Sequence, residues 1–320
     1  MLKFLLKQRR KIGVIKMNKY LDIAPEVGEA LENRRPVVAL ETTVLSHGLP
    51  YPDNVKILKN IENTVRENGA VPAAMAVIGG RLKCGLTEEE IEYLGRKKDE
   101  LIKCSRRDIP AVISRKLDGV TTAAATMIIA NLAGVRIFAT SGIGGVHRGA
   151  EITMDISADL EELARTPILV VCTGVKAILD PGMTLEYLET KGVPVIGYGT
   201  DEFPAFFTKQ RGFRVDYRMD TLKELAETFD AQRKCGLYNG MLVTNPIPEE
   251  ISLDHAAVDQ AVDRAVEEAR QAGIHGKEIT PFLLERINRF TGGKSLDISV
   301  KLIYNNGKVA AQIASQLCKL

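Results

Sequence analysis

The chain has 320 residues, of which 45% are apolar and 26% charged, a composition typical of a globular protein with a buried core. The formal net charge is only +2 and tryptophan is absent, so the sequence predicts no nucleic-acid partner. No apolar run approaches the roughly 20 residues of a membrane span, and no membrane partner is predicted.

Neither the cysteines nor the N-terminus predicts export from the cell. The five cysteines are scattered and form no C-x-x-C pair, which argues against a disulfide framework and favours a reducing, cytoplasmic location. Residues 1–16, MLKFLLKQRRKIGVIK, are basic but lack the long apolar core and cleavage site of a signal peptide. We expect a disordered extension over residues 1–16 and one folded domain over residues 17–320.

Helix and strand patterns alternate along the chain. Its short apolar runs lack polar alternation, which is typical of strands in a sheet covered on both faces. The predicted strands are 36–40, 71–78, 136–140, 168–172, 193–197 and 241–244. The predicted helices are 25–33, one capped by Asp53 and reaching 68, a short one capped by Thr87, 121–132, 184–191, 221–234, 254–272, 280–290 and 296–316. The fold class is therefore α/β: three α/β/α layers, a largely parallel or mixed central sheet, and a helical C-terminal part.

The longest irregular connection covers residues 201–216, DEFPAFFTKQRGFRVD. Its Phe residues and glycine suit a lid over a binding site. They suit packing against the body of the protein equally well, and both interpretations stay open.

A glycine run follows the predicted strand 136–140. It reads Gly142-Ile-Gly-Gly145 and leads into His147 and Arg148. It is not a dinucleotide fingerprint, because the third required glycine falls on His147. The glycines would let backbone N–H groups approach a small phosphate, and the two basic residues would add charge-assisted hydrogen bonds. The alternative is a plain glycine turn.

Two isolated acids stand out. Glu41 ends the strand 36–40, where a partly desolvated carboxylate suits a general acid; the alternative is a surface residue capping a turn. Asp155 is a single carboxylate, which can hold Mg²⁺ or Mn²⁺ if the ion keeps most of its waters. Alternatively, the segment Ser157 to Asp159 is the N-cap of a helix running towards Arg165.

Two lysines complete the candidates. Lys103 begins a basic cluster with Arg106 and Arg107, which suits a phosphate or an anionic base but also a solvated face. Lys176 follows the strand 168–172, where an apolar setting suits a lysine nucleophile. The alternative is an exposed lysine at a helix start, where its charge would oppose the helix dipole. Because strand carboxyl ends meet at one edge of the sheet, the candidates together predict lysine chemistry on a phosphorylated substrate.

Seven stretches from residue 25 to the C-terminus resemble the pseudouridine-5'-phosphate glycosidase family, which includes the indigoidine-synthase-A-like proteins. They are ALETTVLSHGLPYPDN, GGRLKCGLT, KCSRRDIP, ATSGIGGVHRGAEITMDISADL, CTGVKAILD, GYGTDEFPAF and TNPIP. Each is weak alone, but their occurrence in this order is specific. The resemblance implies a homotrimeric enzyme that reversibly splits the C–C bond of pseudouridine 5'-phosphate, giving uracil and ribose 5-phosphate.

The resemblance also implies roles for individual residues. Glu41 is expected to donate a proton to the ring oxygen, and Lys176 to attack C1' and form an imine with the ring-opened sugar. Asp155 is the expected ligand of Mn²⁺, or of another divalent cation such as Mg²⁺. Expected substrate contacts are Lys103, Ala123, Thr140, Ser157, Ala158 and Asp159, and the charges of His147 and Arg148 suit the 5'-phosphate. Two alternatives remain: a lysine-dependent lyase acting on another phosphorylated sugar or C-nucleoside, and a non-catalytic sugar-phosphate-binding homologue.

The chain departs from the family pattern at two positions. The family has Ser-Leu-x-x-Asn near its end, with the Asn reaching the active site, but this chain reads Ser295-Leu-Asp-Ile-Ser299. A shorter hydroxyl therefore replaces an amide, and one substrate contact is affected. Ser141 stands where the family has Gly, a milder change because the neighbouring glycines remain.

Overall fold

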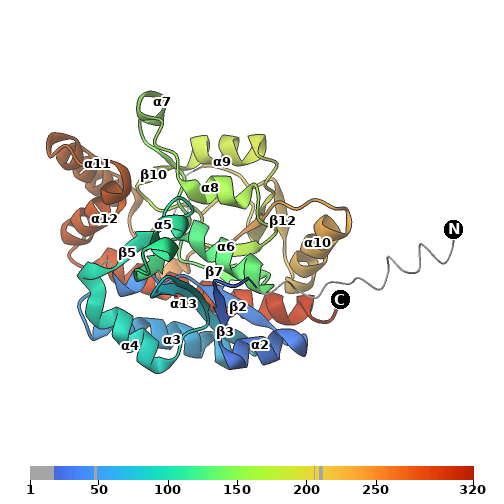
Figure 1. The fold of residues 1–320 in the computed structure, drawn as a ribbon. Coiled ribbons are helices and arrows are strands. Elements are labelled where there is room, and N and C mark those ends of the chain that lie inside the picture. The colour runs from blue at the N-terminus through green and yellow to red at the C-terminus, as the bar shows by residue number, and fades with distance from the viewer. Residues whose placement is uncertain (1–17, 47–48, 205, 209–211) are drawn as a thin grey trace, which may run out of the picture.

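The computed structural model describes residues 18–46, 49–204, 206–208 and 212–320. The extension predicted over residues 1–16 lies outside this part of the chain. Within it, an 11-stranded sheet has the strand order β1-β4-β3-β2-β7-β9-β13-β11-β12, with β6 paired to β3 and β5 paired to β6. Figure 1 shows this sheet between helices on both sides.

The strands are short, most of them three or four residues. They are β1 (Leu21–Ile23), β2 (Val37–Leu40), β3 (Val71–Ile78), β4 (Arg81–Cys84), β5 (Ile102–Cys104), β6 (Gly119–Thr121), β7 (Ile137–Ala139), β9 (Leu169–Cys172), β11 (Val195–Tyr198), β12 (Tyr217–Met219) and β13 (Met241–Thr244). A separate antiparallel pair is formed by β8 (Val146–His147) and β10 (Leu179–Asp180). The main sheet is parallel except where β3 meets β4 and β6, so the predicted mixed, largely parallel sheet is confirmed.

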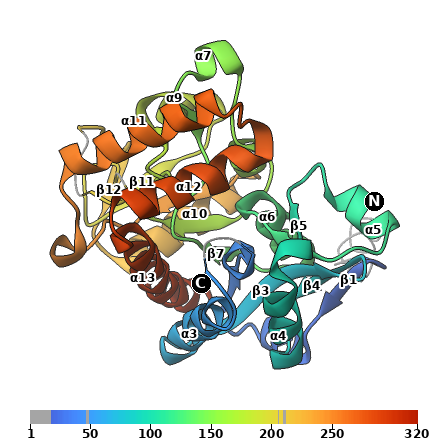
Figure 2. The same cartoon turned by 90° about the vertical axis from the view of Figure 1, so that its left-hand side faces the viewer.

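The helices connect the strands and form the C-terminal part. They are α2 (Pro25–Glu32), α3 (Asp53–Glu67), α4 (Glu88–Lys97), α5 (Ile109–Ser114), α6 (Ala123–Ala133), α7 (Ala150–Thr153), α8 (Ala158–Leu163), α9 (Pro181–Thr190), α10 (Leu222–Lys234), α11 (His255–Gln271), α12 (Ile279–Phe290) and α13 (Lys294–Leu317). In Figure 2, α11 and α12 lie together above α13. None of the helices in the described ranges is long and apolar enough to cross a membrane.

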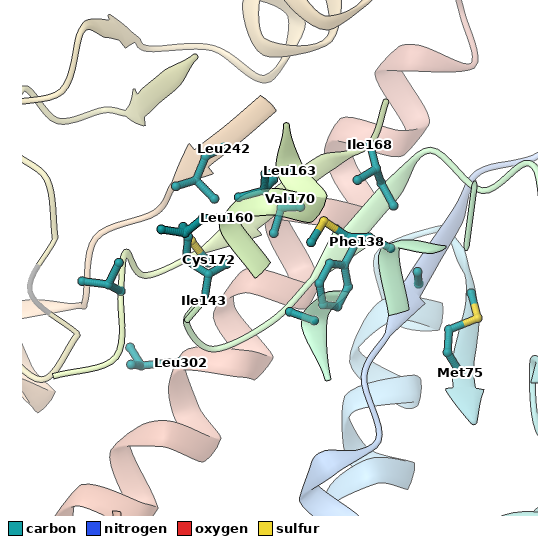
Figure 3. Packing of buried hydrophobic residues seen from close by; sticks show 14 of the residues in the cluster. Met75, Phe138, Ile143, Leu160, Leu163, Ile168, Val170, Cys172, Leu242 and Leu302 are labelled. Carbon is teal, nitrogen blue, oxygen red and sulfur yellow. The ribbon is translucent and has the colours of Figure 1, made fainter. Parts of the chain in front are cut away.

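Alternate strand residues pack into different cores. Ile137 and Ala139 of β7 belong to the core made with α3, α10 and α13. Phe138, between them, packs on the opposite face with residues of α6 and α8, among them Leu160 and Leu163 (Figure 3). Since successive side chains of a strand point to opposite faces, the sheet is covered on both sides, which confirms the three-layer α/β/α prediction.

The helix starts predicted at Asp53 and Thr121 are wrong, and the helix predicted from residue 184 begins at Pro181. Asp53 is the first residue of α3 and not its N-cap; Pro52 precedes it without a side-chain cap, and the Asp53 carboxylate accepts a hydrogen bond from Lys56 (3.1 Å). Thr121 ends β6, where its hydroxyl donates to the Met75 carbonyl (2.8 Å). That strand contact displaces the start of α6 to Ala123. The capping box predicted at Thr87 is confirmed.

The connection 201–216 packs against the body of the protein where the structure describes it. Phe203, Phe206 and Phe207 are each at most 2% exposed, and the rings of the last two meet edge to face with centroids 4.6 Å apart. A Cβ on Gly142 would collide with the Phe206 ring, so a glycine is needed there. The packing interpretation is therefore confirmed for these three residues.

Candidate active site

Three predicted site residues line one cavity of about 690 Å³. Glu41 directly follows β2, Lys103 lies in β5, and Lys176 follows β9. Helices α3, α12 and α13 form the remaining wall with mostly apolar side chains, among them Ile57, Ile61, Phe282, Leu284, Val300 and Ile303. The cavity therefore combines charged side chains at the strand ends with apolar side chains on the helices, and Glu278 and Glu285 also line it. This mixture suits a ligand with one anionic and one flat apolar part.

Both carboxylate oxygens of Glu41 accept hydrogen bonds from threonine hydroxyls. Thr43, two residues along, donates to Oε2 (2.9 Å), and Thr140 at the end of β7 donates to Oε1. Thr140 itself is fully buried. These contacts fix the orientation of the Glu41 carboxylate in the wall of the cavity, as a group that transfers a proton requires.

The backbone around Lys176 is held against the glycine run. The Lys176 N–H donates to the Ile143 carbonyl (3.1 Å), and Ile143 also forms a β-bridge with Val175. Gly174 has a positive φ of 71°, and a Cβ there would collide with the Pro204 carbonyl. Only glycine fits this position, so the turn that presents Lys176 depends on it.

His147 connects the two lysines with Asp155. The His147 side chain is 11% exposed, and burial lowers its pKa, which the charge of Asp155 opposes. The charges of Lys103 and Lys176 lower the pKa of His147 further. His147 Nε2 lies 4.0 Å from Asp155 Oδ2. Asp155, Lys103 and Lys176 thus lie within electrostatic range of His147, whose imidazole is neutral at pH 7.

Asp155 fits a divalent cation that keeps most of its own water. Its side chain is 34% exposed beside the neutral His147, and carboxylate oxygen is a donor that Mn²⁺ and Mg²⁺ accept. Among the described residues there is no group of three or more His, Cys, Asp or Glu side chains that could enclose an ion. Any ion held here would therefore take most of its ligands from water and substrate.

Asp159 organises the neighbouring loops. Its carboxylate accepts the backbone N–H groups of Ala124 (2.9 Å) and Gly144 (2.8 Å). The hydroxyl of Ser157 accepts from the Asp159 N–H (3.2 Å) and caps α8, which begins at Ala158. The predicted contacts Ala123, Ser157, Ala158 and Asp159 are thereby brought together at the starts of α6 and α8. The predicted helix start at this segment is confirmed.

The glycine run is used for packing and internal hydrogen bonds. The N–H of Gly144 goes to Asp159 and that of Ile143 to the Gly174 carbonyl (3.1 Å). A Cβ on Gly144 would collide with Ser157. These donors are engaged within the protein, which favours the interpretation as a glycine turn.

Two arginines from the predicted anion-binding groups have carboxylate partners. Arg148 donates to Asp263 (2.5 Å) and Asp259 (3.2 Å) of α11. Arg106 donates through two nitrogens to Glu162 (2.6 and 2.8 Å), whose side chain is 1% exposed. Arg106 therefore compensates a buried charge while its own side chain stays 49% exposed, which agrees with the solvated-face interpretation.

One residue that the sequence analysis missed ties the strand ends together. Asn306 of α13 is fully buried. Its Nδ2 donates to the Thr140 carbonyl (2.8 Å) and the Thr173 hydroxyl (3.1 Å), and its Oδ1 accepts from Asn245 (3.0 Å). These partners follow β7, β9 and β13. The sequence did contain a signal for this role: an amide stands inside the otherwise apolar stretch of the last helix, and a buried polar group needs hydrogen-bond partners.

Comparisons with known proteins cover nearly the whole chain. Residues 26–316 match the family described as "Indigoidine synthase A like protein". The chain is 57% identical over 304 residues to a pseudouridine-5'-phosphate glycosidase of Clostridium botulinum, with 95% of this chain and 99% of that protein covered. A pseudouridine-5'-phosphate glycosidase of Caldanaerobacter subterraneus is 56% identical over the same shares of both chains.

Solved structures show the same fold. The prealnumycin C-glycosynthase AlnA in complex with ribulose 5-phosphate matches with a TM-score of 0.87 at 37% identity, covering 94% of this chain and 98% of that one. An indigoidine synthase A-like protein of Thermotoga maritima matches with a TM-score of 0.84 at 32% identity, covering 93% and 96%. The chain therefore belongs to the family of the pseudouridine-5'-phosphate glycosidases and indigoidine synthase A-like proteins.

Proposed function

We propose that the protein reversibly cleaves pseudouridine 5'-phosphate with water, giving uracil and ribose 5-phosphate. The observation that carries the proposal is the convergence of Glu41, Lys103 and Lys176 on one cavity. The relatives named as pseudouridine-5'-phosphate glycosidases, at more than 50% identity over nearly their full length, support this substrate. AlnA, whose structure holds ribulose 5-phosphate, supports a sugar phosphate as ligand.

In the proposed mechanism the sugar ring opens before the C–C bond breaks. Glu41 gives a proton to the ring oxygen while the Lys176 amine attacks C1', which breaks the bond from C1' to the ring oxygen and leaves a secondary amine. After protonation of the base at C5, the C–C bond breaks: its electron pair stays with the base, which leaves as neutral uracil, and the lone pair of the lysine nitrogen forms the imine at C1', so no free carbanion departs. Water then releases ribose 5-phosphate and restores the lysine. Thr43 and Thr140 hold the Glu41 carboxylate in place throughout.

The proposal extends to the cation, the assembly and the cell compartment. Asp155 would hold Mn²⁺ or Mg²⁺, whose positive charge stabilises the anionic substrate.

The protein would form a homotrimer, and α7 supports an oligomer because its end exposes Ile152 (85%) and Met154 (74%) to solvent. A cytoplasmic location stays a prediction from the scattered cysteines.

A second candidate is a lysine-dependent lyase acting on another phosphorylated sugar or C-nucleoside. Ser299 favours it, because this residue lines the cavity where the family carries an amide. Comparing the rates for pseudouridine 5'-phosphate with those for other pentose phosphates separates the two candidates.

The deciding experiment traps the imine. The protein is treated with borohydride in the presence of ribose 5-phosphate, and its intact mass is measured beside Lys176→Ala. One reduced sugar phosphate on the wild-type chain, and none on the variant, is the expected result. An adduct of equal yield on Lys176→Ala would refute Lys176 as the nucleophile. Absence of uracil release from pseudouridine 5'-phosphate by the wild type would refute the substrate.

A further inference from the structure

Asn288 of α12 lines the same cavity as Glu41 and Lys176, and its amide has a defined orientation. The backbone N–H of Leu296 donates to Asn288 Oδ1 (3.3 Å), and so does the Ser295 hydroxyl (3.3 Å). A backbone N–H can only donate, so the atom in contact must be the carbonyl oxygen of the amide. The Nδ2 group, with two hydrogens to donate, therefore points away from Leu296 and Ser295.

Ser299 also lines the cavity, but its short side chain carries a hydroxyl in place of an amide. Its hydroxyl donates to the Ser295 carbonyl (2.8 Å) within the same helix. Ser295 thus contacts both residues: its hydroxyl holds Asn288, and its carbonyl holds Ser299. Asn288 and Ser299 both line the cavity, and of the two only Asn288 carries an amide.

We propose that Asn288 supplies the amide donor that residue 299 lacks in this chain, and that its Nδ2 group binds a carbonyl oxygen of the pyrimidine base. The inference rests on the proposed function. Apolar side chains of α12 and α13, among them Phe282 and Ile303, line the same cavity as Asn288 and suit contact with a flat base. Lys103 and Lys176 also line it, and their charges suit the sugar phosphate. An amide N–H is the complement of a base carbonyl.

The test removes the proposed amide donor of Asn288 and keeps its hydrogen-bond acceptor. In Asn288→Asp one carboxylate oxygen can still accept the hydrogen bonds from Leu296 and Ser295. The other oxygen replaces the Nδ2 group and cannot donate. We expect kcat/KM for pseudouridine 5'-phosphate to fall about tenfold to a hundredfold, because a substrate carbonyl loses its donor. Asn288→Ala, which adds no charge, is expected to lose a similar amount. Asn131→Asp, the same change on the exposed surface of α6, is the matched control and should keep wild-type kinetics.

Placing an amide at residue 299 completes the test. The double variant Asn288→Asp/Ser299→Asn is expected to regain most of the lost kcat/KM, and Asn288→Ala/Ser299→Asn likewise. Wild-type kcat/KM in both single variants would overturn the proposal. So would a loss that Ser299→Asn does not relieve and that accompanies a lower melting temperature, because Asn288 would then only join α12 to α13.

The role of Asn288 can be tested even if the proposed function is wrong. If the wild-type protein releases no uracil, the proposed substrate is wrong, and Asn288 is tested by calorimetric titration with uracil in the presence of ribose 5-phosphate. Weaker uracil binding to Asn288→Asp than to the wild type would support the donor role. Equal binding would overturn it.

Discussion

At the scale of single residues, the site depends on a few side chains whose partners restrict what they can do. Glu41 is held through both oxygens, and His147 is kept neutral by burial and by two nearby lysines. Asp155 is different, because it stays partly exposed beside His147 at 4.0 Å. A carboxylate left open to solvent next to a neutral imidazole is the group here best suited to a hydrated cation.

Asp155→Asn is therefore expected to weaken Mn²⁺ binding at least about tenfold, because a neutral amide replaces the charged ligand. Binding is measured by electron paramagnetic resonance of free Mn²⁺, independently of turnover. Asp263→Asn, which alters an exposed carboxylate of α11, serves as the matched control. Chelation of the wild-type protein should lower turnover, and added Mn²⁺ should restore it. Equal Mn²⁺ affinity of Asp155→Asn and wild type would show that the cation binds elsewhere.

At the scale of elements, α13 links the cavity to the sheet. Its first turns carry Ser299 and Ile303 into the cavity wall, and Asn306 then binds the ends of β7 and β9. Its later residues, such as Val309 and Ile313, pack in the core with α3 and α10. One helix therefore sets the distance between the cavity wall and the strand ends that present Glu41 and Lys176.

Asn306→Ala is expected to lower the free energy of unfolding by about 1–3 kcal/mol, because buried partners lose their hydrogen bonds. We also expect kcat to fall more than KM rises, since Thr140 and Thr173 position the reacting groups. Urea denaturation and steady-state kinetics measure the two effects. Asn305→Ala, at the half-buried neighbouring residue, is the control. A stable, folded Asn306→Ala with wild-type kcat would exclude the positioning role.

At the scale of the whole molecule, α7 extends from the body of the protein (Figure 1). Asp155 directly follows Met154 at the end of α7. Contacts that a neighbouring subunit makes with α7 would therefore also affect the carboxylate that we propose as the cation ligand. Large exposed apolar side chains on a projecting segment are typical of protein interfaces. Ile152 and Met154 are the most exposed of the large apolar residues that the structure describes.

We expect the protein to have three times its chain mass of 35.1 kDa in light scattering after gel filtration. The double variant Ile152→Asp/Met154→Asp should shift this mass towards one chain, because charges at the tip cannot be buried unpaired. Leu237→Asp, at another exposed apolar residue, is the matched control. A wild-type mass of one chain would overturn the homotrimer, and an unchanged trimer in the double variant would exclude α7 from the interface.

Much of the architecture could be predicted because it follows from local sequence. The runs at Val37–Leu40 and Leu169–Cys172 are apolar throughout and form buried central strands. The capping box at Thr87 starts its helix as expected. The strands β1, β4, β5, β6 and β12 were not predicted: three or four residues of mixed polarity carry too little pattern, and pairing with neighbours creates them.

The sequence by itself determined which chemical groups the site can use, and it indicated the family through the order of its motifs. Only the tertiary structure decided how those groups meet. In the sequence, Arg148 and Arg106 could not be distinguished from basic residues that bind an anionic ligand. In the structure they donate hydrogen bonds to the carboxylates of Asp263 and Glu162, which are distant in the chain. Asn288 carried no local signal, and the amide of Asn306 did not reveal its partners, because the roles of both residues arise from partners elsewhere in the chain. A hydrogen bond between distant segments depends on packing of the whole sheet and its helices, and no short stretch of sequence encodes that packing.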